Sequence, residues 1–454
     1  MLARSTPLHS SRTSGRTSIS VVARAFTALR HRNFRLFWFG QLISLVGTWM
    51  QSIGQAWLVL ELSHNNALLL GLVGALQFLP VLILSLLGGV IADRWPKRRL
   101  LLGTQSSAMI LAFLLFALTV THVVQVWHIL VLATLLGTVN AVDMPTRQSF
   151  VVEMVGREDV MNAVALNSSL FNTARIVGPG IGGVLIGWLG VAPLFLLNGI
   201  SFLAVIFGLA IMRTEELHAA AHPKSQGGWR GSFTQLGEGL RYVCQASVML
   251  TIVLLVAAVG TFALNLNVIL PLFATDVLRV GASGYGFMSA ITGAGSLVAA
   301  LVIAAAGRKP RMSVLLMSGA GLAGSEVAFA LSRSYLLSLV LLAAIGFATI
   351  CFSATANTAL QTGSPDHLRG RIMGLYVVVF AGTTPIGNLF TGALAGWWGA
   401  TISLIAGAAI AALAVILSLP RRAEVITAPA EQTQEGPAQH MLTSTTQPTL
   451  VSKR

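Results

Sequence analysis

The chain of 454 residues is 55% hydrophobic and only 10% charged, and its mean hydropathy is +0.78. An ordinary soluble domain is about a quarter charged, so this chain has too little charge to cover a water-facing surface, and lipid must cover much of it. Cys244 and Cys351 give neither a disulfide framework nor metal-ligand spacing, and no phosphate-binding loop or nucleophile motif is present. The composition therefore argues against a soluble enzyme, and we expect no catalytic residue, metal or cofactor.

Twelve stretches are long and apolar enough to cross about 30 Å of hydrocarbon, which takes about 20 residues. They lie near 36–60, 67–91, 99–121, 127–148, 163–189, 191–212, 248–273, 284–305, 312–331, 336–360, 371–395 and 400–419. A polar stretch after the sixth divides them into two equal sets. We predict an all-α polytopic membrane protein whose twelve transmembrane helices form two six-helix halves, 36–213 and 248–420.

The segments outside these halves are polar. Residues 1–35 form a tail rich in Arg, Ser and Thr that resembles a transit peptide, although we favour a disordered cytoplasmic tail. Residues 214–247 form a cytoplasmic linker, and its stretch 233–243 has the apolar spacing of a helix lying on a membrane surface. Residues 421–454 are rich in Thr, Gln and Pro and are expected to be a disordered cytoplasmic tail.

The net charge of +14 comes from Lys and Arg in short loops rather than from a clustered surface for nucleic acid. Suppose that the two tails, the linker and the loops after the second, fourth, eighth and tenth spans are cytoplasmic. All 29 Lys and Arg except Arg175, Arg279 and Arg333 then lie on that side. Cytoplasmic loops carry such an excess. We therefore expect a multi-pass protein of the inner (cytoplasmic) membrane with both termini in the cytoplasm.

The first span carries a polar stripe. At 100° per residue, the side chains of Gln41, Ser44, Thr48, Gln51, Ser52 and Gln55 fall within an arc of about 100°. Such a stripe faces a partner helix or a watery cavity rather than lipid. Hydrogen bonds to a partner helix, worth about 0.6 kcal/mol each, are one explanation. We favour a substrate cavity because the stripe is longer than one helix contact needs, and we assign to the same cavity Asn140, Asn172, Arg175 and Asn265.

The loop after the second span reads Gly-Val-Ile-Ala-Asp-Arg-Trp-Pro-Lys-Arg from position 89. It resembles the motif between the second and third helices of the major facilitator superfamily, Gly-x-x-x-Asp-Arg-x-Gly-Arg-Arg. The glycine would let the helix end pack closely, and the acid and cations can form a breakable ion-pair lock. Pro96 replaces the usual glycine and should stiffen the turn. The predicted lock residues are Gly89, Asp93, Arg94, Lys97 and Arg98.

The fifth span reads Ala-Arg-Ile-Val-Gly-Pro-Gly-Ile-Gly-Gly from position 174. This is similar to the exporter motif of the superfamily, Gly-x-x-x-Gly-Pro-x-x-Gly-Gly, with Ala174 in place of the first glycine. Generic helix packing is the alternative explanation, because small residues let helices approach closely. The motif residues are Arg175, Gly178, Pro179, Gly182 and Gly183.

Two further segments, 140–148 and 365–374, are similar to the branch of the superfamily that contains the enterobactin exporter and macrolide efflux proteins. The resemblance covers 34–420 and implies proton-driven export by two halves that rock against each other. It extends the predicted lock to Asp366, Arg369 and Arg371.

An internal repeat also indicates two related halves. The segment Gly187-Trp-Leu-Gly matches Gly396-Trp-Trp-Gly at an offset of 209 positions, and the same offset pairs Gly183 with Gly392. Many secondary transporters are built from such repeats, with the substrate site between them.

Three ionisable side chains lie within predicted spans. Arg175 is about 18 Å into its span, near the midplane, where an arginine contacts substrate or forms a structural ion pair. Asp143 is one turn from Arg147 and is expected to pair with it. For Glu326, about 21 Å along its span, we favour a side chain that reaches outer water near Arg333. Asp143 and Glu326 are the candidates for proton coupling.

These patterns predict a monomeric secondary transporter that exports a drug, siderophore-like or other amphipathic molecule in exchange for protons. Its expected partners are the substrate, protons and membrane lipid, and no nucleic acid. One alternative is an uptake permease of the same fold, against which the exporter motif argues. The other is a receptor or scaffold without transport, which would be expected to carry a long folded domain outside the membrane.

Overall fold

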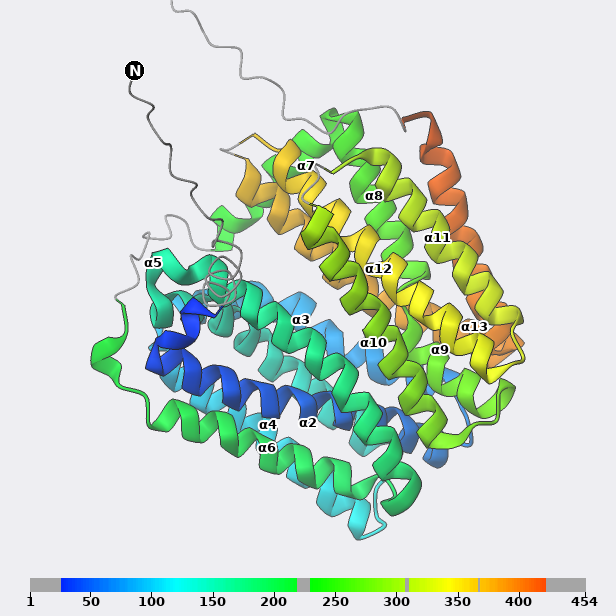
Figure 1. Ribbon diagram of the computed structural model, residues 1–454, viewed down its shortest axis with the longest axis horizontal. Coiled ribbons are helices and arrows are strands. Elements are labelled where there is room, and N and C mark those ends of the chain that lie inside the picture. The colour runs from blue at the N-terminus through cyan, green and yellow to red at the C-terminus, as the bar shows by residue number, and fades with distance from the viewer. Residues whose placement is uncertain (1–25, 219–228, 307–309, 366–367, 422–454) are drawn as a thin grey trace, which may run out of the picture.

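The computed structural model describes residues 26–218, 229–306, 310–365 and 368–421, and nearly all of them are helical (Figure 1). The α-helices are α2 (Arg32–Ser63), α3 (Ala67–Arg94), α4 (Lys97–Val120), α5 (Val126–Leu189), α6 (Ala192–Ala210), α7 (Trp229–Gln245), α8 (Ser247–Phe262), α9 (Leu266–Leu272), α10 (Gly281–Ala306), α11 (Met312–Leu331), α12 (Tyr335–Gly363) and α13 (Arg369–Ser418). Short turns complete the order, namely the 3-10 turns η1 (Thr27–Arg30), η2 (Thr214–Glu216) and η4 (Leu419–Arg421) and the π-helical turn η3 (Phe273–Val277).

These helices account for the twelve predicted spans. In the described part of the chain, nine helical stretches are long and apolar enough to cross a membrane, one of them formed by α8, α9 and η3 together. Two of the nine supply two spans each, because α5 bends at Gly156 (φ 72°) and α13 at Gly399 (φ 85°), which glycine allows without strain. The remaining span is α2, which carries the polar stripe.

The helices pack as two halves. The N-terminal half comprises α2 to α6, and the C-terminal half comprises α8 to α13 (Figure 1). Between the halves, α3 lies against α13 and α5 lies against α10. The linker stretch predicted to be helical forms part of α7, which packs on α8 and α13.

The internal repeat extends to individual contacts. Gly137 of α5 packs directly on the Gln77 carbonyl of α3, and Gly346 of α12 packs directly on the Thr292 carbonyl of α10. The two glycines are 209 positions apart, and their two partners are 215 positions apart. The two halves therefore place equivalent residues in equivalent contacts.

The halves touch closely at one end of the bundle. A Cβ on Gly183 of α5 would lie 2.6 Å from the Cα of Gly286 in α10, and a Cβ on Gly392 of α13 would lie 3.0 Å from the Cα of Gly71 in α3. We call this the contact end; it carries the α2–α3 and η3–α10 connections, where Asn65 Nδ2 donates to Asp276 Oδ1 at 3.1 Å. The opposite end, which carries α7 and the α3–α4 connection, is the linker end.

Candidate functional site

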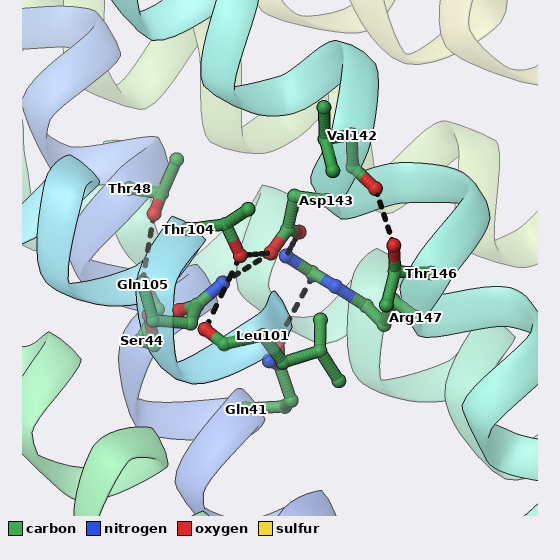
Figure 2. Close-up of polar contacts among 10 residues, drawn as sticks. All are labelled: Gln41, Ser44, Thr48, Leu101, Thr104, Gln105, Val142, Asp143, Thr146 and Arg147. Atoms are coloured by element: carbon green, nitrogen blue, oxygen red, sulfur yellow. Dashed lines mark hydrogen bonds and ion pairs between the residues drawn. The ribbon is translucent and has the colours of Figure 1, made fainter. Parts of the chain in front are cut away.

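Asp143 is the centre of a buried polar network formed by α2, α4 and α5 (Figure 2). Its side chain is 1% exposed and makes an ion pair with Arg147, one turn further along α5, as predicted. Thr104 Oγ1 and Gln105 Nε2 of α4 donate hydrogen bonds of 2.7 and 2.8 Å to Asp143 Oδ1. A buried carboxylate is costly unless it is paired and hydrogen-bonded, so these three partners offset the cost of burying Asp143.

Arg147 connects this carboxylate to the polar stripe of α2. Its Nη1 donates to Gln41 Oε1 at 2.9 Å (Figure 2). Gln41 Nε2 and Arg147 Nε are also buried, but neither has a hydrogen-bond partner among the described residues. A buried donor without an acceptor costs about 1–3 kcal/mol. These two groups could therefore donate hydrogen bonds to a further oxygen, from a substrate or from water.

The backbone around Asp143 is shaped by a proline and a glycine. Pro145 removes one backbone donor from α5, and Thr146 Oγ1 donates to the Val142 carbonyl at 2.7 Å. Gly88 of α3 lies so close to α5 that a Cβ would overlap the Ala141 carbonyl. As a result, α3 meets α5 backbone to backbone within one turn of Asp143.

The prediction that Gly89 packs closely against a neighbouring helix is wrong. A Cβ on Gly89 would have no atom within 4 Å, whereas the adjacent Gly88 makes the close contact. The reason is rotational, because adjacent residues of a helix point about 100° apart and only one can face α5. The part played by Gly89 in the lock stays a prediction.

The other stripe residues of α2 are largely inside the protein. Ser44, Gln51 and Gln55 are buried and Thr48 is half-buried. Gln51 Oε1 accepts a 2.7 Å hydrogen bond from Asn198 Nδ2 of α6, and Thr48 Oγ1 donates to the Ser44 carbonyl of its own helix at 2.9 Å. Gln41 and Gln51 thus bond to neighbouring helices, which is the alternative explanation for the stripe. The substrate cavity stays a prediction.

Two of the three predicted cavity asparagines lie on α5, on either side of its bend at Gly156, and the third lies in the C-terminal half. Asn140 and Asn172 of α5 are half-buried, and Asn172 Nδ2 donates to the Ser168 carbonyl at 2.9 Å. Asn265, at the break between α8 and α9, is buried and donates to the Thr261 carbonyl at 2.7 Å. Both of these bonds lie within a residue's own helical segment, so they do not join the asparagines to the Asp143 network.

Arg175 lies half-buried on α5, with its guanidinium carbon 6.0 Å from the centre of the Trp49 ring of α2, a cation–π arrangement. It has no acidic partner within the described residues, so the structural ion pair has no support there. Further along the exporter motif, Gly178 and Gly182 pack on the backbone of α2, Pro179 is buried, and Gly183 packs on α10. Both close packing and an exporter role are consistent with this geometry.

The predicted position of Glu326 is wrong. Its side chain is completely buried in α11, and both carboxylate oxygens lack a partner among the described residues. Arg333 Nη1 donates instead to two carbonyls of its own turn, each at 3.1 Å. Glu326 shares a helix face with the fully buried Leu322 and Phe329, and that face packs on α12 and α13 rather than reaching outer water. Its use as a proton carrier stays a prediction.

The cations of the first predicted lock segment are engaged within the N-terminal half. Lys97 is buried and pairs with Glu153 of α5. Arg98 donates to two carbonyls at the end of α6, at 2.6 and 2.7 Å. Asp93 and Arg94 are exposed, and neither has a hydrogen-bond or ion-pair partner in the described part of the chain. The lock itself stays a prediction.

The second predicted lock segment contacts the linker helix. Arg371 of α13 pairs with Glu238 of α7, and Arg369 Nε donates to the Gln361 carbonyl at 3.0 Å. Asp366 lies outside the described residues. The N-terminal tail up to residue 25 and the C-terminal tail from residue 422 also lie outside them.

Sequence reasoning missed Thr104 and Gln105, and it did not place Gln41 beside Arg147. One signal was available, because Thr104 and Gln105 open a run of four polar residues within an otherwise apolar span. Polar side chains inside a span usually face the protein interior, and in this run Gln105 is buried and Thr104 half-buried, whereas Ser107 is exposed. The partner of this run on α5 depends on how the helices are rotated, which the sequence does not show.

Three curated relatives resemble the chain over most of its length. It is 28% identical to the multidrug efflux pump Tap of Mycobacterium tuberculosis, over 87% of this chain and 95% of that protein. It is 23% identical to the staphyloferrin A transporter of Staphylococcus aureus, over 78% and 87%. It is 24% identical to the enterobactin exporter EntS of Shigella boydii, over 85% and 90%.

The solved structure of the nucleoside transporter NupG has the same fold, with a TM-score of 0.69 at 13% identity, over 87% of this chain and all of that one. The family model described as transmembrane secretion effector matches residues 23–452. This fold and family are those of transporters rather than enzymes, and the efflux relatives confirm the resemblance that the sequence motifs indicated. The chain belongs to the transmembrane secretion effector family of the major facilitator superfamily.

Proposed function

We propose that the protein is a secondary transporter that exports a small amphipathic molecule across the cytoplasmic membrane in exchange for protons. The observation that carries this proposal is the Asp143 network, in which a buried acid and its paired cation lie beside two donors, Gln41 Nε2 and Arg147 Nε, that have no acceptor among the described residues. The names of two relatives, a multidrug efflux pump and an enterobactin exporter, support the outward direction. Drugs and siderophore-like molecules are therefore the substrate classes to test first.

The linker end faces the cytoplasm in this proposal, together with both termini. The support is the distribution of the 29 Lys and Arg residues, which leaves only Arg279 and Arg333 in loops on the other side. The contact end then faces outward, so the described arrangement is closed to the outside. The proposal includes a monomeric protein.

Transport proceeds by rocking of the two halves about the central helices α3, α5, α10 and α13. Parting the glycine contacts at the contact end would open the site to the outside. At the linker end, Cβ positions on Gly370 and Gly374 of α13 have no atom within 4 Å, which leaves room for an approach of the N-terminal half. In this proposal Asp93, which is exposed and has no partner among the described residues, forms the lock when that end closes.

Proton coupling is assigned to the Asp143–Arg147 pair. The ionised Asp143–Arg147 pair would bind substrate from the cytoplasm, with Arg147 Nε and Gln41 Nε2 donating to a substrate oxygen. A proton that reaches Asp143 from the outside would neutralise the carboxylate and displace the substrate, and release of this proton to the cytoplasm would re-form the ion pair. A ligand shifts a conformational equilibrium only by its difference in affinity for the two states, and this exchange supplies such a difference.

The test is accumulation of candidate compounds in an efflux-deficient host that expresses the protein, with and without a proton uncoupler. We expect lower accumulation of at least one amphipathic compound, reversed by the uncoupler and absent with Asp143→Asn. Phe352→Leu is the matched control, since Phe352 of α12 lies 209 positions after Asp143, at the offset of the internal repeat. This variant should export normally. Export that persists in the uncoupler, or in a well-expressed Asp143→Asn protein, would contradict the coupling scheme.

A further inference from the structure

An apolar groove runs along the C-terminal half, away from the Asp143 network. Helices α10 and α11 follow each other in sequence and both pack extensively on α12, but scarcely on each other (Figure 1). The space between them is a cavity of about 720 Å³, within the range of about 300–1,000 Å³ typical of ligand pockets. Ala344 and Phe347 of α12 lie on its floor, and Val298 of α10 and Met317 of α11 lie on its walls.

The groove owes part of its width to a glycine. Gly321 of α11 lines it, and a Cβ on Gly321 would have no atom within 4 Å. Gly324, one turn further along, also has open space at its Cβ position but does not line the groove. A large side chain at position 321 would therefore fill the groove, whereas the same side chain at position 324 would not.

The groove opens onto the lipid-facing surface of the protein. Its wall residues Val298, Val314 and Met317 are 52%, 44% and 73% exposed, and all lie within apolar spans. The phase that surrounds such residues is the hydrocarbon of the bilayer. An occupant that enters from this side is thus a lipid, and the apolar lining suits an acyl chain.

The cationic side chain of Arg311 lies at the linker end of the α11 face that lines the groove. Arg311 precedes α11 directly, and positions 311, 318 and 325 recur every two turns, with Ser318 and Ser325 both lining the groove. The Arg311 side chain is exposed, makes no capping bond to α11 and has no hydrogen-bond or ion-pair partner among the described residues. It is therefore available to a negatively charged headgroup.

The length of the groove matches one leaflet of a membrane. From Val314 to Ser325 the lining spans twelve residues of α11, and the eleven rises between them, of about 1.5 Å each, give about 16 Å. Half of a hydrocarbon core of about 30 Å is about 15 Å. An acyl chain anchored at Arg311 would thus end near the bilayer midplane.

From this geometry we propose that the groove between α10, α11 and α12 is a binding site for one anionic phospholipid. One acyl chain lies on Ala344 and Phe347, and the phosphate lies against Arg311. The site belongs to the C-terminal half alone and shares no residue with the Asp143 network, so it does not depend on the proposed export. Lipid bound there would bridge α10, which contacts the N-terminal half, and the outer helix α11.

The experiment titrates purified full-length protein in detergent with phosphatidylglycerol and counts bound lipids by native mass spectrometry. Phosphatidylcholine with the same acyl chains is the uncharged comparison. We expect one phosphatidylglycerol to bind the wild type, and Gly321→Leu or Ala344→Phe to weaken it at least tenfold. Arg311→Gln should weaken phosphatidylglycerol about fivefold and leave phosphatidylcholine unchanged, since one cation near a lipid surface contributes about that factor.

Two matched controls share the chemistry of these changes without touching the groove. Gly324→Leu adds the same side chain to α11, and Arg157→Gln removes an exposed cation of the N-terminal half; both should bind within twofold of the wild type. In a Cys244→Ser protein, the groove residue Cys351 provides a second readout. Its reaction with a membrane-soluble maleimide should slow when phosphatidylglycerol is added.

Some outcomes would overturn the proposal. One is equal binding by Gly321→Leu, Ala344→Phe and the wild type. Another is a preference for phosphatidylglycerol that survives Arg311→Gln. Retention of a compound other than a phospholipid in the groove, displaced by no added lipid, would also overturn it and would identify a different occupant.

Discussion

The two halves share their contacts but not their chemistry. In the N-terminal half, Thr104 of α4 donates a hydrogen bond to Asp143 of α5. The equivalent of Thr104 in the C-terminal half is Gly319 of α11, 215 positions later, and the equivalent of Asp143 is Phe352 of α12, 209 positions later. There Gly319 packs on Phe352. Arg147 corresponds in the same way to Ala356, which is fully buried. The same helix contact is therefore polar in one half and apolar in the other.

This difference separates the contacts that give both halves the same fold from the charged side chains that are present at this contact in the N-terminal half alone. Contacts made by glycine and backbone recur in both halves, because they set how closely helices pack. Charged side chains inside a membrane are costly and are retained where they do something. In the proposed function, we interpret the N-terminal half as the one that exchanges protons through Asp143, and the C-terminal half, which is apolar at this contact and buries Glu326 elsewhere, as the frame against which it moves. Four substitutions test this division, from the largest expected effect to the smallest.

The largest effect is expected for Arg147→Leu. It leaves the Asp143 carboxylate buried without its ion pair, which costs about 3–5 kcal/mol and should deplete the folded protein. The double variant Asp143→Asn with Arg147→Leu should recover stability but not transport. Denaturant unfolding in detergent, measured beside transport, checks both parts. The control Phe352→Leu should cost under about 1.5 kcal/mol, and an equal loss in the two halves would refute the division.

Asp93→Asn should abolish transport while expression and insertion stay normal. The proposed lock needs a negative charge at position 93 when the linker end closes, and asparagine keeps only the shape. Glu215→Gln, at another exposed acid of the linker end, is the matched control and should transport normally. Full transport by well-expressed Asp93→Asn protein would rule out a required ionised lock.

Arg175→Ala should lower transport about tenfold without lowering the amount of folded protein, because the side chain has no acidic partner among the described residues to strand. Arg175→Lys should keep part of the activity and shift substrate preference, since lysine keeps the charge and loses the planar fork. Thr384→Ala changes the equivalent residue of α13 and should leave transport unchanged. Joint loss of folded protein and transport in Arg175→Ala would point to a structural role instead.

The smallest effect on transport is expected for Gln41→Leu. The change removes the hydrogen bond from Arg147, worth about 1 kcal/mol, but also removes a buried amide nitrogen that lacks a partner. The two effects oppose each other, so the free energy of unfolding should change by under about 1 kcal/mol while transport falls several-fold. A large loss of stability would show that Gln41 acts mainly as a link between helices.

The spans could be predicted from hydropathy because a membrane helix is a continuous local signal, and the predicted span 312–331 has the same bounds as α11. The Asp143–Arg147 pair was also predictable, since one helical turn separates the two residues. Contacts between helices were not, because they depend on rotation about each axis. That is why Gly88 rather than Gly89 packs on α5, and why Glu326 faces the interior instead of outer water.

The central claim is that the contact end must open during transport, and a reversible cross-link tests it directly. Both native cysteines are first replaced, by Cys244→Ser and Cys351→Ser. A disulfide between Gly187→Cys and Ser283→Cys would then join α5 to α10. A Cβ on Gly187 lies 3.8 Å from the Ser283 Cβ, which is the spacing of a disulfide. The equivalent pair, Gly396→Cys and Leu68→Cys, joins α13 to α3. Either cross-link should form readily and stop transport, and reduction should restore it. Full transport by the oxidised, cross-linked protein would contradict the account.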